Sequence, residues 1–232
     1  MWLLAVDTTS RDASVALLQD TRLLALVATP GDEPHSTRLF CDIQRALAEA
    51  NLKLRDIDVY AVANGPGAFT ALRVGLSAIK GLAEMHNKPV VAVSVLEAVC
   101  QSAESGPGIL VPIVDAYRKQ VFGGVYEKTT DDIVPCASER VLTLEEFLAT
   151  LAQEGFQSAH CCIVSPHLDR FVETLAASRF AQAARERVSP ALAAAVARRA
   201  QQKFARGQIL NALSLEANYV RRSDAELLWK PK

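Results

Sequence analysis

The stretch "GPGILVPIVDA" (106–116) decides the fold, because the order of secondary-structure elements begins again there. Its glycines and proline interrupt the chain, and the apolar run that follows predicts a buried strand ending in an acid. The chain starts in the same way, since "WLLAVDTT" (2–9) is a short apolar run ending at Asp7 and two threonines. Two matching strands, ending at Asp7 and Asp115, therefore predict two similar halves.

The patterns that follow these two strands extend the similarity. Residues 1–105 predict three strands, a helix, a strand, a helix, a strand and a helix. Residues from 106 on predict a similar but degraded order that becomes mostly helical after Ser165, up to about Arg206. Two such lobes facing each other across a cleft describe the α/β actin-like ATPase fold, also called ASKHA or RNase H-like, here with a reduced second lobe. We expect lobes at 1–105 and 106–232, with the tail 216–232 packing back on the first lobe.

Composition favours a folded protein of a reducing compartment. Half of the 232 residues are hydrophobic, so the chain can bury a substantial core, and the net charge of −1 favours neither nucleic acid nor membrane. The five cysteines are odd in number and form no C-x-x-C, which argues against a disulfide framework or a zinc knuckle. With no apolar run near 18 residues, we expect a soluble, cytoplasmic protein without a membrane partner.

One segment of the chain is strongly basic although the net charge is close to zero. Residues 179–206 carry seven basic residues and one acidic residue. One interpretation is an anionic partner such as tRNA, contacted by Arg198, Arg199 and Lys203. The other is a solvated helix face whose basic last turn suits the helix dipole.

The stretch "NGPGAFTALRVGLSAIKGLA" (64–83) predicts a sharp turn that opens directly into a helix. A P-loop is excluded because Ala68 and Phe69 follow Gly67 where lysine and a hydroxyl residue are required. A dinucleotide fingerprint lacks its third glycine, and Pro66 removes one backbone N–H from any phosphate cradle. Generic phosphate binding stays open as an alternative.

The helix itself carries two apolar stripes and only a narrow polar strip. One stripe contains Leu72, Leu76, Ile79 and Ala83, and the other contains Gly67, Ala71, Gly75, Ala78 and Leu82. Because a helix lying on a sheet needs a single apolar stripe, we expect this helix to be covered on both sides. The sheet covers one side, and either another element of the chain or a second protein covers the other.

Several motifs, in this order, resemble the TsaB family, also called YeaZ. They are "AVDTTSRDASVALL", "HSTRL", the helix stretch quoted above, "VDAYRKQVFGGVYE" and "YVRRSDAEL". The resemblance implies a non-catalytic subunit that activates the transferase TsaD in forming threonylcarbamoyladenosine on tRNA. It further implies TsaE, an ATPase, as a partner, TsaC as the supplier of the activated adenylate, only indirect contact with tRNA, and a self-dimer when the chain is alone.

The resemblance also places the TsaD interface on the first two helices of the first lobe, here Ser36–Ala50 and Ala68–Met85. The expected interface residues are Leu39, Ile43, Ala71, Leu72, Gly75, Leu76, Ala78, Ile79 and Leu82.

No catalytic residue, metal ligand or cofactor of this chain's own is expected. The resemblance implies that TsaD carries H-x-x-x-H after the fifth strand, and the corresponding residues here are Val95 and Val99, which cannot bind a metal. Weak candidates for a metal–phosphate site are the strand-end residues Asp7, Thr8, Thr9 and Asp115. The alternatives are a stand-alone ATP-dependent kinase or a metallopeptidase-like enzyme of the same fold.

Overall fold

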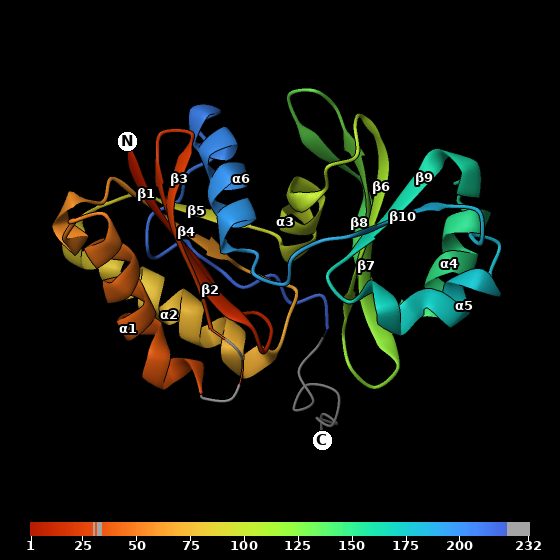
Figure 1. The fold of residues 1–232 in the computed structure, drawn as a ribbon, viewed down its shortest axis with the longest axis horizontal. Coiled ribbons are helices and arrows are strands. Elements are labelled where there is room, and N and C mark those ends of the chain that lie inside the picture. Colours follow the sequence, from red (N-terminus) through yellow and green to blue (C-terminus); the bar gives the residue numbers. More distant parts are fainter. Residues whose placement is uncertain (30, 32–33, 222–232) are drawn as a thin grey trace, which may run out of the picture.

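The structure is a computed structural model that describes residues 1–29, 31 and 34–221. It consists of two lobes, each built around a five-stranded sheet (Figure 1). The elements of the first half are β1 (Trp2–Asp7), β2 (Ala13–Gln19), β3 (Arg22–Thr29), α1 (His35–Glu49), β4 (Val59–Ala63), α2 (Phe69–His86), β5 (Val90–Val93) and α3 (Val95–Ser102). Those of the second half are β6 (Gly108–Asp115), β7 (Gln120–Lys128), β8 (Ile133–Thr143), α4 (Leu144–Gln153), β9 (Cys161–Ser165), α5 (Val172–Ala176), β10 (Ala184–Arg187) and α6 (Ala193–Ala205).

The two sheets have the same topology. The first has the strand order β3-β2-β1-β4-β5, and the second, read from its other edge, has the order β8-β7-β6-β9-β10. In both sheets the first three strands pair antiparallel and the last two add in parallel. Each parallel strand follows a helix, as a crossover connection requires.

The second lobe repeats every element of the first, which the sequence alone did not predict. Strand β10 lies in the stretch 166–206 that we expected to be mostly helical. The alanines around it favour a helix, but pairing in parallel with β9, at the edge of the sheet, decides the conformation of these four residues. The second lobe is reduced in the length of some of its elements, since α5 has only five residues.

Helices α3 and α6 lie between the two sheets, and each packs on the sheet of the other half (Figure 1). Helix α3 contacts β6 and β7, while α6 contacts β1, β2, β4 and β5. A single central core joins these two helices to the inner faces of both sheets. Two further cores lie outside it, one under α1 and α2 and the other under α4 and α5.

This exchange changes how the chain divides into lobes. Helix α6 packs on the first sheet, although it falls within the second lobe that we expected at 106–232. The following segment stays there: the backbones of Leu210 and Val90 exchange two hydrogen bonds of 2.8 and 2.9 Å. Residues 222–232 of the predicted tail lie outside the described part of the structure.

Among the described residues, no helix combines the length and the apolarity needed to cross a membrane.

Candidate functional site

The Gly-Pro-Gly turn before α2 serves close packing. A Cβ added to Gly67 would lie 2.6 Å from Cβ of Thr9, and one added to Gly75 would lie 2.5 Å from Oγ1 of Thr8. The backbone N–H of Ala68 donates to the carbonyl of Thr9 at 2.9 Å. The glycines therefore let the start of α2 press directly against the turn that follows β1.

The same packing engages the strand-end residues that we considered for a phosphate site. The hydroxyl of Thr8 donates to the carbonyl of Ala71 at 2.8 Å. Asp7 is fully buried, and its Oδ1 accepts from the backbone N–H and the hydroxyl of Thr9 at 2.9 and 2.7 Å. Burial raises the pKa of Asp7, and its Oδ2 is buried without a hydrogen-bond partner among the described residues. Asp7 and Thr8 are thus built into the lobe and do not reach its surface.

Asp115 lies at the equivalent strand end of the second lobe and is also engaged. Its side chain forms an ion pair with Arg170, and its Oδ1 accepts from the backbone N–H of Tyr117 at 2.8 Å. The following Tyr117, Arg118 and Lys119 all have positive φ, so this carboxylate anchors a tight turn.

A cleft of about 900 Å³ separates the two strand ends. Its walls come from the turn after β1, the start of α2, the turn after β6, the segment after β9 and residues 218–221 of the tail. Thr9 and Asp115 line it, whereas Asp7 and Thr8 are not among its lining residues. Such a volume suits a nucleotide-sized ligand.

The two positions that we expected to correspond to metal ligands of TsaD are apolar and buried. Val95 and Val99 are 1% and 0% exposed and belong to the central core. Among the described residues, no three His, Cys, Asp or Glu side chains gather in a way that could hold a metal ion.

The structure corrects most of the expected partner interface on α1 and α2. Seven of the nine residues lie in the outer core of the first lobe, packed between the helices and their own sheet: Leu39, Ile43, Leu72, Gly75, Leu76, Ile79 and Leu82. Of these, Ile43 and Ile79 have no exposed surface. The spacing of these residues predicted correctly that they are buried. The surface that buries them is the sheet of their own lobe, which supplies a continuous apolar face, and not a partner protein.

Helix α2 nevertheless presents an outer stripe to solvent. Ala78, an expected interface residue, is half-buried and shares one helix face with Val74, Gly81 and Met85. Met85 is 76% exposed. On the neighbouring α1, Phe40 is 50% exposed. We call Val74, Ala78, Gly81, Met85 and Phe40 the outer surface.

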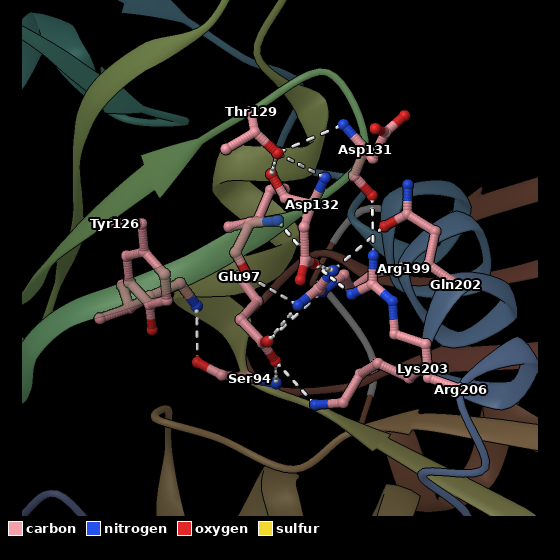
Figure 2. Close-up of polar contacts among 12 residues, drawn as sticks. Ser94, Glu97, Tyr126, Thr129, Asp131, Asp132, Arg199, Gln202, Lys203 and Arg206 are labelled. Carbon is pink, nitrogen blue, oxygen red and sulfur yellow. Dashed lines mark hydrogen bonds and ion pairs between the residues drawn. The ribbon is translucent and has the colours of Figure 1, made fainter.

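The basic residues of α6 also face largely inward (Figure 2). The side chain of Arg199 is 5% exposed and donates to Glu97 at 3.1 Å, to Asp132 at 2.6 Å and to the carbonyl of Ile133 at 2.7 Å. Lys203 donates to the other oxygen of Glu97 at 3.0 Å. We therefore withdraw Arg199 and Lys203 as tRNA contacts, whereas Arg198 is exposed.

This ion network joins both halves of the chain. Glu97 lies on α3, Arg199 and Lys203 lie on α6, and Asp132 lies in the turn between β7 and β8. Burial alone would raise the pKa of Asp132, but hydrogen bonds from Arg206 and Arg199 hold it well below its usual range. One signal in the sequence points to Glu97: it completes the capping box of Ser94, and its apolar helix contains no other charge.

The comparisons with known proteins match this architecture. The family described as "TsaD: tRNA N6-adenosine threonylcarbamoyltransferase" matches residues 30–218. The chain is 29% identical to the Bacillus subtilis protein named tRNA threonylcarbamoyladenosine biosynthesis protein TsaB, over 66% of this chain and 67% of the relative. It is also 35% identical to a tRNA N6-adenosine threonylcarbamoyltransferase of Thermus thermophilus, over 62% of this chain and 52% of that one. The chain thus spans about half to two thirds of these curated relatives.

Solved structures extend the likeness to nearly the whole chain. YeaZ from Pseudomonas aeruginosa superposes with a TM-score of 0.78 at 28% identity, covering 94% of this chain and 99% of that one. A hexokinase from Thermus thermophilus has a TM-score of 0.51 at 12% identity, a likeness of fold alone. These neighbours confirm the predicted actin-like ATPase fold. The chain belongs to the TsaD family and, within it, to the TsaB/YeaZ group.

Proposed function

We propose that this chain is a non-catalytic subunit that binds and activates a TsaD-type transferase in forming N6-threonylcarbamoyladenosine on tRNA. The relatives named TsaB support a role in biosynthesis of this modification.

The main observation against catalysis by this chain concerns the expected metal-ligand positions. The residues there are Val95 and Val99, and both are buried in the central core. A valine side chain has no lone pair to offer a metal ion, and the surrounding apolar core could not hold one. The strand-end Asp7 and Thr8, which a kinase of this fold would need at the phosphates, are bonded within their own lobe. This argument disfavours the kinase and metallopeptidase alternatives as well.

The outer surface is where we place the TsaD-type partner. Small residues such as Ala78 and Gly81 allow another helix to approach closely, and the exposed side chains of Met85 on α2 and Phe40 on α1 add apolar area. Burying a Met or Phe side chain contributes roughly 1.5–3 kcal/mol, so a few such residues can form the centre of an interface. The same surface serves a self-dimer when the partner is absent. A TsaE-type ATPase completes the assembly.

A reconstituted reaction tests this proposal. The chain is mixed with TsaD-, TsaC- and TsaE-type proteins, tRNA, threonine, bicarbonate and ATP, and the modified nucleoside is measured after tRNA digestion. We expect no product without the TsaD-type protein and a much lower rate without this chain. Product formed by this chain in the absence of the TsaD-type protein would refute the non-catalytic role.

Two variants separate activation from catalysis. Asp7→Asn removes the strand-end carboxylate and should leave the rate of the complete reaction unchanged. Gly81→Glu places a charge in the middle of the outer surface, where an added Cβ meets nothing within 4 Å, and should lower the rate by preventing assembly. If Asp7→Asn abolished the reaction and Gly81→Glu did not, the chain would be acting through chemistry of its own.

A further inference from the structure

The interlobe cleft has a charge opposite to that of the chain. Of the described residues that line it, five are arginines, namely Arg11, Arg73, Arg118, Arg170 and Arg221, and two carry carboxylates, Asp12 and Asp115. Asp115 is already paired with Arg170. Arg11 is exposed, and neither it nor Arg73 has a carboxylate within ion-pair distance among the described residues. A chain with net charge −1 thus gathers positive charge in one cavity, which favours an anionic ligand.

An aromatic pair also lines the cleft. The rings of Phe69 and Tyr219 stack with their centroids 5.3 Å apart and their planes at 28°. The guanidinium of Arg73 lies 3.9 Å from the centroid of Phe69, and its Nε donates to the hydroxyl of Tyr219 at 3.1 Å. Tyr219 remains 47% exposed. The pair therefore offers a fixed aromatic surface beside the arginines.

The tail holds this surface in place across the two lobes. The backbone N–H of Asn218 donates to the carbonyl of Asn64 in the first lobe at 2.7 Å, and its side chain donates to Glu139 on β8 at 2.6 Å. Gly65 makes room for this crossing, since a Cβ there would lie 2.6 Å from the carbonyl oxygen of Asn218. Residues 219–221, the described part of the family motif "YVRRSDAEL", thus line the cleft.

Arginines combined with an exposed ring are the groups that bind unpaired nucleotides, because phosphates pair with the cations and bases stack on the ring. We propose that the cleft binds a single-stranded segment of RNA, with a base on Tyr219 and phosphates at Arg11 and Arg73. That the RNA is the tRNA substrate rests on the proposed function. Binding of RNA by this chain does not.

Direct binding of labelled RNA, followed by fluorescence anisotropy, tests this proposal on the purified chain. The probes are an anticodon stem-loop, a fully paired duplex of equal length, and ATP as a competitor. We expect the stem-loop to bind and the duplex to bind much more weakly. Tyr219→Ala should weaken stem-loop binding at least about five-fold, the smallest loss typical of a stacked base. Tyr219→Phe, which keeps the ring but loses the hydrogen bond from Arg73, should bind clearly more tightly than Tyr219→Ala.

Charge variants test the phosphate pairing. Arg11→Glu should weaken binding and make the salt dependence shallower, by about 0.7 in log–log slope for each phosphate that the protein no longer neutralises. The control Arg198→Glu changes an exposed arginine of α6 outside the cleft and should have no effect. Equally weakened binding in the two variants would place the RNA on α6 and overturn the proposal.

Three other outcomes would also overturn it. The first is that the chain does not bind the stem-loop. The second is that Tyr219→Ala binds the stem-loop as tightly as the wild type and unfolds at the same temperature. The third is that ATP displaces the stem-loop fully and with similar affinity, which would make the cleft a mononucleotide site. Failure here leaves the proposed function standing if the reconstituted reaction still depends on the chain. Conversely, RNA binding without any dependence of the reaction on the chain would refute the proposed function alone.

Discussion

Helices α2 and α6 both bury side chains, but those of α2 are aliphatic and one of those of α6 is an arginine. Helix α2 turns its aliphatic residues onto its own sheet and leaves a thin outer stripe, while α6 turns a cation inward against acids from α3 and the β7–β8 turn. An aliphatic side chain is satisfied by any apolar surface, whereas a buried guanidinium requires its own counter-charges. The sequence of α2 thus predicts burial by itself, and that of α6 does not.

A buried charge on α2 should have the largest effect. Ile79→Glu places a carboxylate among apolar side chains, so we expect it to destabilise the chain by on the order of 4 kcal/mol or more, measured by urea unfolding of the monomer. Ser77→Glu, on the exposed side of the same helix, serves as the control and should stay near wild type. If Ile79→Glu gave a stable monomer, Ile79 would belong to a partner interface and not to the core of its own lobe.

The corresponding change on α6 should be nearly as large. Arg199→Met removes the buried cation that Asp132 and Glu97 share but leaves them Arg206 and Lys203, so we expect a loss of up to about 3–5 kcal/mol. Arg198→Met, at the adjacent exposed position, should stay within about 0.5 kcal/mol of wild type. Chemical denaturation of both variants compares them directly. Equal stabilities would show that the network of Figure 2 contributes nothing to folding.

Substitutions of two glycines compare the inner and the outer side of α2. Gly75→Ala brings a methyl group against Thr8, and such overpacking costs about 1–3 kcal/mol. Gly81→Ala meets open space and should stabilise the helix by up to about 1 kcal/mol. Thermal unfolding should therefore shift in opposite directions. A gain in stability from Gly75→Ala would mean that α2 does not press on the β1 turn.

The smallest effect concerns the buried carboxyl group beside α2. Burial raises the pKa of Asp7 above its ordinary 3.8, so the folded chain keeps this proton at a pH where the unfolded chain has lost it. Stability from this group therefore falls as the pH rises from about 4 to the folded-state pKa. Relative to wild type, Asp7→Asn should gain stability between about pH 4 and about pH 7, measured by urea unfolding at both. A difference that does not change with pH would contradict a raised pKa.

Local patterns predicted most of the fold. Apolar runs and turn residues located nine of the ten strands found in the described residues, because each run has a length and a boundary typical of its element. Strand β10 was missed because its pairing with β9 lies outside its own sequence. The exchange of α3 and α6 between the sheets was missed for the same reason, since periodicity shows that a face is buried but not which surface buries it.

The candidate site was predicted less well than the fold. Residue identity decides only one point, namely that Val95 and Val99 cannot bind a metal ion. The pairing of Arg199 with Asp132 joins residues 67 positions apart and cannot be read from either segment alone. The aromatic wall formed by Phe69 and Tyr219 also depends on the tail returning to α2.

The central claim is that α2 keeps its aliphatic side for its own sheet and offers only its outer surface to a TsaD-type partner. Size-exclusion chromatography with light scattering, on the chain mixed with that partner, tests it most directly. We predict that the double variant Gly81→Glu, Met85→Glu unfolds like wild type but forms no heterodimer, while Ala149→Glu, an exposed alanine on α4, still does. A heterodimer that persists undiminished in the double variant would contradict the account.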